Sequence, residues 1–203
     1  MTDLNFIYWD SSIWLSNFLE DQDFPFAEQQ LERIKHGSEV IVVSNLVLME
    51  IIGVLRQRTI EKQTYTGITE KQKADLKKLA DDEVTKALTI IRDLARSRKV
   101  IITSSKMSVS ELHKKTYDIL SCWVFGDIIP TNKRCKCPAC GIIRSPTTYR
   151  LKYPGHYDIQ HALLANEPIS NSSRVNEIVS VDRAFTQLNT LKDFQHLLIT
   201  VAN

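Results

Sequence analysis

The chain has 203 residues, of which 43% are hydrophobic and 25% are charged, a composition typical of a globular protein with a sizeable core. No apolar run approaches the roughly 18 residues of a bilayer-spanning helix, and the N-terminus lacks the basic region of a signal peptide, so we expect a cytoplasmic protein with no membrane contact. The formal net charge is +2, but residues 128–157 carry six basic residues and no acid; subtracting this +6 leaves −4 on the remainder.

The first half of the chain alternates apolar runs, typical of buried strands, with helical patterns. LNFIYWD predicts a strand, and SSIWLSNFLED predicts a helix capped by Ser11 or Ser12. Residues 26–36 predict a second helix, EVIVVS a strand and NLVLMEIIGVLRQR a third helix. Residues 69–98 carry a long helical stripe, in which the pair Asp81-Asp82 marks a candidate break between two helices.

The second half continues the alternation around one interruption. KVIIT predicts a strand and VSELHKKTYDILSCW a helix; YDIQHALLANE predicts a helix, EIVSVD a strand, RAFTQLN a short helix and HLLITV a last strand. Prolines and glycines concentrate between the two groups, so residues 125–153 are expected to form an irregular inserted lobe. We therefore predict one α/β domain, residues 1–203, with a central mainly parallel sheet flanked by helices.

Four acids occupy the places where such a sheet forms its site. Asp10 and Asp182 end strands, Asp158 opens a helix, and Glu50 lies near the start of the helix after the second strand. Convergent carboxylates repel one another unless a cation lies between them, and oxygen ligands suit Mg²⁺ or Mn²⁺. The alternative for Asp10, Asp158 and Asp182 is simple helix capping, since acids are favoured at helix starts.

Four segments in order, FIYWDSS, VVSNLVLMEI, YDIQHALLAN and IVSVDRAF, resemble the motifs of PIN-domain ribonucleases, particularly the VapC-like branch of toxin–antitoxin systems. The resemblance implies a PIN-like fold and Mg²⁺- or Mn²⁺-dependent hydrolysis of RNA to a 3′-hydroxyl and a 5′-phosphate. It further implies a small antitoxin protein as partner and a homodimer. The implied site residues are the catalytic metal ligands Asp10, Glu50, Asp158 and Asp182, with Ser180 near the metal. We add Ser11 and His161 as supporting residues, the latter because its spacing places it on the same helix face as Asp158.

Two departures from the family pattern leave alternatives open. The chain is longer than a compact VapC toxin, and Ala184 stands where some members carry a further acid. A nuclease of RNA maturation, a nuclease acting on DNA, and a PIN-like nucleic-acid- or partner-binding module without turnover therefore remain alternatives. Ser11 and Ser12 also fit a capping role, and His161 also fits a hydrogen-bonded structural role.

The cysteine run KRCKCPACGIIRSP offers thiolates in the form of a zinc knuckle. We expect structural Zn²⁺ held by Cys135, Cys137, Cys140 and Cys122, with His156 or His113 as substitutes for the last; the alternative is free thiols in a loop. The surrounding basic and aromatic residues predict a nucleic-acid contact, the alternative being a solvated face. The predicted contact residues are Lys133, Arg134, Lys136, Arg144, Arg150, Lys152 and Tyr153, followed by Tyr157.

Overall fold

The computed structural model describes residues 4–61, 68–121, 155–170 and 173–202, together with the backbone of four short strands between 128 and 151. Five parallel strands form the central sheet in the order β3-β2-β1-β8-β9. These strands are β1 (Phe6–Trp9), β2 (Val40–Ser44), β3 (Val100–Thr103), β8 (Val175–Ser180) and β9 (Leu198–Val201). The prediction of an α/β fold with a central parallel sheet is confirmed.

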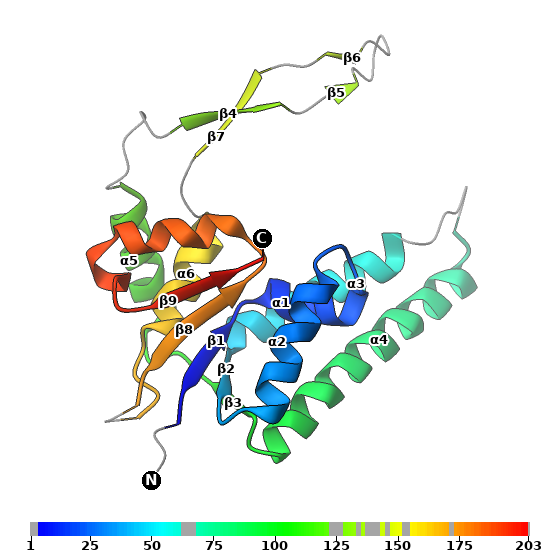
Figure 1. Cartoon of the computed structure of the whole chain (residues 1–203). Helices are drawn as coiled ribbons and strands as arrows, with labels where there is room; N and C mark the ends of the chain where they lie inside the picture. The colour runs from blue at the N-terminus through cyan, green and yellow to red at the C-terminus, as the bar shows by residue number, and fades with distance from the viewer. Residues whose placement is uncertain are drawn as a thin grey trace.

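Helices cover both faces of this sheet, as Figure 1 shows. One side carries α1 (Ser11–Leu19), α2 (Phe24–His36), α3 (Asn45–Glu61) and α4 (Glu70–Arg96). The other side carries α5 (Val109–Ser121) and α6 (His156–Ala165), which pack on each other, and the 3-10 helix η2 (Arg183–Thr190), which is followed by η3 (Lys192–Phe194). No described helix has the length and apolarity needed to cross a bilayer.

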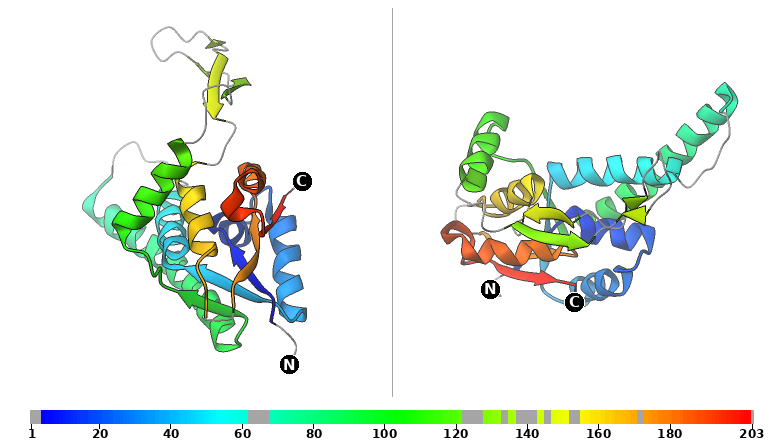
Figure 2. Two further views of the ribbon diagram at one scale, coloured as in Figure 1. Left: turned by 90° about the vertical axis from the view of Figure 1, so that its left-hand side faces the viewer. Right: turned by 90° about the horizontal axis from the view of Figure 1, so that it is seen from above.

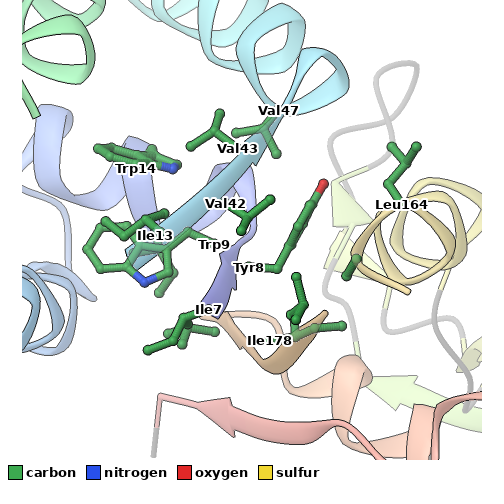
Figure 3. Packing of buried hydrophobic residues seen from close by; sticks show 14 of the residues in the cluster. Ile7, Tyr8, Trp9, Ile13, Trp14, Val42, Val43, Val47, Leu164 and Ile178 are labelled. Carbon is green, nitrogen blue, oxygen red and sulfur yellow. The ribbon is translucent and has the colours of Figure 1, made fainter. Parts of the chain in front are cut away.

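The central strand β1 is buried along its whole length, so its side chains contribute to the core on both faces of the sheet. Successive side chains of a strand point to opposite faces, so Trp9 packs with Trp14 of α1, their ring centroids 4.9 Å apart, while Tyr8 faces α6. Figure 3 shows Tyr8 and Leu164 on one side of the strand and Trp9, Ile13 and Trp14 on the other. The two indole N–H groups have no hydrogen-bond partner among the described residues.

A charged network ties α2 to the far half of the sheet. Glu177, in the buried strand β8, is 3% exposed. It accepts two hydrogen bonds from Arg33 at 3.0 and 2.8 Å and a third from the Thr200 hydroxyl at 2.6 Å. The hydrogen bonds that Arg33 donates to Glu177 and then to Glu39 raise the pKa of Arg33 further above its ordinary value. A carboxylate can be buried here because all these donors replace its water.

Three local expectations were wrong. Asp10, rather than Ser11 or Ser12, is the N-cap of α1. The stretch with Asp81 forms one helix, α4, because the buried stripe continues through it while the Asp81 carboxylate points outward to Lys77 Nζ at 2.8 Å. The stretch expected to be an irregular lobe contains two antiparallel strand pairs, β4 (Ile128–Asn132) with β7 (Thr147–Leu151) and β5 (Cys135–Lys136) with β6 (Ile143–Arg144). Figure 1 and the left view of Figure 2 show these pairs standing away from the main sheet.

Candidate active site

The candidate site lies where the chain reverses its course across the sheet. The central strand β1 has β2 on one side and β8 on the other, and each neighbour belongs to a different half of the fold. In open parallel sheets such a reversal leaves a crevice at the carboxyl ends of the strands. Asp10 follows β1 at that end and its backbone N–H donates to the Val179 carbonyl oxygen at 3.0 Å, so the residue is fixed against β8.

Asp10 is a buried carboxylate with a full set of donors. It is 5% exposed. Its Oδ1 accepts the backbone N–H of Ser11 at 2.7 Å, while its Oδ2 accepts the hydroxyls of Ser12 at 2.6 Å and Ser180 at 2.9 Å. Donors of this kind replace the water that a buried carboxylate loses, and they fix its orientation. The helix cap expected as the alternative role is therefore present, and the same contacts fix the orientation of the carboxylate.

A histidine connects Asp10 to a second acid. His161 of α6 is 1% exposed, and its Nε2 lies 2.7 Å from Glu50 Oε2 and 3.5 Å from Asp10 Oδ1. Ionised carboxylates only accept hydrogen bonds, so we assign the hydrogen to Nε2. The ring therefore lies between two negative groups and orients Glu50.

The other ring nitrogen of His161 is also occupied. Nδ1 lies 2.8 Å from the Tyr8 hydroxyl, which lies 2.8 Å from Ser44 Oγ at the end of β2. Ser44 Oγ in turn accepts the Val47 N–H at 3.3 Å. Burial raises the pKa of Tyr8 well above its usual value, so the phenol stays neutral. A neutral hydroxyl can donate to or accept from Nδ1, so this chain of contacts satisfies both the neutral and the protonated imidazole.

The charges of Glu50 and His161 stabilise each other, and this shifts both pKa values. Burial favours the neutral form of Glu50, but the hydrogen bond and charge of His161 outweigh it, and the pKa of Glu50 lies below its usual value. Burial likewise opposes the charge on His161, yet the bond to Glu50 and the charge of Asp10 raise the pKa of this histidine above its usual value. In the absence of another cation, a protonated His161 therefore balances two carboxylates.

Two further acids flank this pair. Asp158 lies in the first turn of α6, where its Oδ2 accepts the Gly155 N–H at 2.7 Å. Burial raises the pKa of Asp158 to about 6. The hydrogen bond from Gly155 opposes this shift, whereas the negative charges of Asp182 and then Asp10 add to it. Asp182 caps η2 through Oδ1, which accepts the Ala184 N–H at 2.8 Å. Each cap uses one carboxylate oxygen, and the other oxygen accepts no hydrogen bond from the described residues.

The donor set of this cluster fits a divalent cation. One ligand atom each from Asp10, Glu50 and His161 lies within 4.8 Å of the other two. Carboxylate oxygens suit Mg²⁺ and Mn²⁺, whereas imidazole suits later transition metals. Because both nitrogens of His161 already have partners, the ring fits the role of orienting Glu50 better than that of a direct ligand. The carboxylates would then hold the ion, with Asp158 and Asp182 offering their second oxygens.

The sequence missed part of this arrangement. Tyr8, Ser12 and Ser44 were not selected as site residues, although Tyr8 contacts His161, Ser12 contacts Asp10, and Ser44 contacts Tyr8. The only sequence signal for Tyr8 is a hydroxyl within an apolar strand, and burial alone explains an aromatic residue there. Of the supporting residues, Ser180 donates to Asp10 from its side chain and Ser11 from its backbone. The catalytic assignments themselves stay predictions.

The predicted zinc site and basic contact surface fall largely outside the described residues. Cys122, Cys137 and Cys140 lie there, as do Lys133, Arg134, Lys152 and Tyr153, whereas Cys135, Lys136, Arg144 and Arg150 are described only as backbone. The two substitute ligands, His113 and His156, lie close together, with ring centroids 5.5 Å apart. The zinc site, the basic contact and the separate lobe stay predictions.

Comparisons with known proteins gave structural likeness only. No family model and no curated protein matches the sequence. One similar solved structure is VapBC2 of Rickettsia felis bound to a DNA fragment from its promoter, with 13% identity, a TM-score of 0.45, and coverage of 98% of this chain and 99% of that chain. Another is VapC20 of Mycobacterium tuberculosis, described as a sarcin-ricin loop cleaving toxin, with 13% identity, a TM-score of 0.46, and coverage of 89% and 92%. At these values the likeness carries no argument about activity or partners.

Proposed function

We propose that this protein is a Mg²⁺- or Mn²⁺-dependent endoribonuclease whose acidic quartet is Asp10, Glu50, Asp158 and Asp182. The observation that carries the proposal is the convergence of Asp10 and Glu50, with His161, to within 4.8 Å at the carboxyl end of the sheet. The raised pKa of Asp158, to which the charges of Asp182 and Asp10 contribute, supports its membership of the same cluster. Structural capping alone would not require these acids to approach one another.

The residues of the chain have distinct roles in this proposal. A bound divalent ion would supply an activated water and offset the charge that develops on the phosphate. Asp10 is the fixed anchor, because hydrogen bonds from Ser11, Ser12 and Ser180 hold both of its oxygens. Glu50 is oriented by His161, which is itself held by Tyr8.

The outer acids complete the site. Asp158 and Asp182 approach from α6 and from the end of β8, so the substrate phosphate would enter between elements that the sheet holds in place. In hydrolysis the water oxygen forms the new bond to phosphorus, the bond from phosphorus to the 3′ oxygen breaks, and the water proton leaves to the solvent or to the new 3′-hydroxyl. No covalent enzyme intermediate is needed.

The proposed biological setting is a VapC-like toxin restrained by a small antitoxin protein, with a homodimer as the assembly. The support is the order of the four sequence motifs. Co-purification of the natively expressed chain with a small inhibitory protein tests the setting. Free, active protein with no such companion would favour the alternative of RNA maturation.

The activity itself is tested by cleavage of single-stranded RNA in Mg²⁺, in Mn²⁺ and in a chelator. Asp10→Asn and Asp158→Asn preserve a side-chain oxygen for each helix cap, so we expect folded proteins that lose cleavage by more than about a hundredfold. Asp75→Asn, at an exposed position of α4, is the matched control and should cleave as the parent does. Parental activity in both site variants, or equal cleavage in the chelator, would overturn the proposal. Binding of RNA without cleavage in any divalent metal would favour the alternative of a binding module.

A further inference from the structure

Two histidine rings from neighbouring helices lie side by side on the surface of the protein. His113 of α5 and His156 of α6 have ring centroids 5.5 Å apart, and their planes are tilted by 60°. Both residues are exposed, and the two helices that carry them pack on each other. We call these two rings the histidine pair, and neither has a role in the proposed nuclease site.

The histidine pair lies apart from the acid cluster. Successive residues of a helix are about 100° apart around its axis, so His156 lies about 140° from His161 and about 160° from Asp158 on α6. His161 points into the crevice, where its Nε2 contacts Glu50. His156 therefore lies on another side of α6, where it meets His113, and a ligand of the histidine pair would not be a ligand of the acids.

The separation of the two rings matches that of imidazoles sharing one metal ion. A zinc–nitrogen bond is about 2.0–2.1 Å long and the ring centre lies roughly 1.1 Å beyond the nitrogen, so each centroid would lie about 3.2 Å from the ion. At the tetrahedral angle of about 109°, the two centroids are then about 5.2 Å apart. The observed 5.5 Å is close to this value, so an ion between two ring nitrogens needs rotation of the side chains but no movement of a helix.

A buried side chain holds one of the two rings. Gln160, one turn after His156 on α6, is only 4% exposed, and its amide Nε2 lies 3.0 Å from His156 Nε2. Turned over about its last bond, the same amide presents Oε1, which accepts the hydrogen of that ring nitrogen. His156 Nδ1 is then the ligand atom, and histidines that bind metals usually donate their other ring N–H to such an acceptor. An exposed histidine without a ligand has no need of a buried partner for its orientation.

The chemistry of the histidine pair selects the class of metal. Neutral imidazoles suit Zn²⁺, Cu²⁺ and Ni²⁺, whereas Mg²⁺ and Ca²⁺ prefer oxygen ligands. Lys114, next to His113, has its amine 2.7 Å from the Asp118 carboxylate, so a carboxylate compensates this neighbouring positive charge. Because both rings are exposed, water can fill the remaining positions around the ion.

We propose that His113 and His156 together bind one transition-metal ion, represented by Zn²⁺, outside the acid cluster. The ion ties α5 to the first turn of α6, and that turn also carries Asp158. This inference does not rest on the proposed nuclease function. It also differs from the zinc site predicted from the cysteines, where one histidine at most would replace a cysteine, because here both rings are ligands of one ion.

Calorimetric titration of the full chain with Zn²⁺ tests the site, in saturating Mg²⁺ so that the carboxylate oxygens are already occupied. We expect the parent to bind one equivalent that both His113→Asn and His156→Asn lose, and both variants should fold because the positions are exposed. Gln160→Met keeps a side chain of similar volume without the hydrogen bond, and should weaken binding of that equivalent by about tenfold. Zn²⁺ should also raise the Tm of the parent but not of the two histidine variants, because it binds the folded arrangement of α5 and α6.

Controls separate the histidine pair from other ligands of the chain. His196→Asn, at an exposed position before β9, is the matched control and should keep the zinc equivalent. Cys137→Ser should keep it as well, and the Co²⁺ equivalent lost in the histidine variants should lack the intense near-ultraviolet band of thiolate ligands. A parent without the equivalent, or its loss in only one histidine variant, would overturn the histidine pair as a metal site. Its loss in Cys137→Ser, or a thiolate band on the Co²⁺ equivalent, would assign the ion to the cysteines and overturn the proposal equally.

Discussion

The ionisation of Asp158 sets a pH range in which metal affinity should change. Its pKa is raised to about 6 by burial and by the charges of Asp182 and Asp10. Below that pH the carboxyl is protonated and cannot bind a cation; above it the carboxylate is available. A group of pKa ~6 is about nine-tenths ionised at pH 7 and about one-tenth ionised at pH 5, so apparent affinity should fall about tenfold between them. A carboxyl of ordinary pKa would change by less than about 10% over the same range.

The assay is calorimetric titration with Mn²⁺ at constant ionic strength, in half-unit steps from pH 5 to pH 7. Asp158→Asn is the comparison, because asparagine keeps an acceptor for the Gly155 N–H. We expect this variant to bind Mn²⁺ more weakly at pH 7 and to depend less on pH, with the remaining slope due to His161, whose pKa is also raised. Equal slopes for parent and variant, or a flat profile for the parent, would refute the reasoning.

Three further predictions concern stability to urea. Glu177→Gln removes the charge that Arg33 pairs with inside the sheet, and should lower the free energy of unfolding by roughly 2–4 kcal/mol. Tyr8→Phe removes the hydroxyl partner of His161 Nδ1 and should cost about 1–3 kcal/mol, because a buried polar atom loses its bond. Thr69→Ala removes the capping box of α4 and should cost about 1 kcal/mol.

Each stability prediction has an outcome that contradicts it. For Glu177, the control is Glu39→Gln, which alters the more exposed partner of Arg33 and should cost less than half as much; the reverse order would contradict the network. A Tyr8→Phe protein as stable as the parent would mean that His161 does not need the phenol. For Thr69, replacement by serine should retain the cap, and a loss equal to that of alanine would show that the cap hydrogen bond is not the cause.

The local sequence pattern predicted the main strands and helices, but not the finer details of the fold. Alternating apolar runs and helical stripes predicted the five parallel strands, because strands buried on both faces need uninterrupted apolar side chains. The pattern could not show that α4 continues unbroken through Asp81 and Asp82, because the apolar stripe on the other side of the helix decides this. Nor could it predict the short antiparallel pairs of residues 128–151, whose composition signals only turns.

For the site, the sequence by itself identified which acids follow strands or open helices, because those positions are local properties of the chain. Only the tertiary structure decided which of them meet. Glu50 and His161 are 111 residues apart, and their 2.7 Å contact depends on how α3 and α6 pack on opposite sides of β1. The link from His161 through Tyr8 to Ser44 likewise joins three elements that no spacing rule connects. Side-chain direction and burial across the sheet are set by packing over long sequence separations, so the acids were predictable and their histidine connection was not.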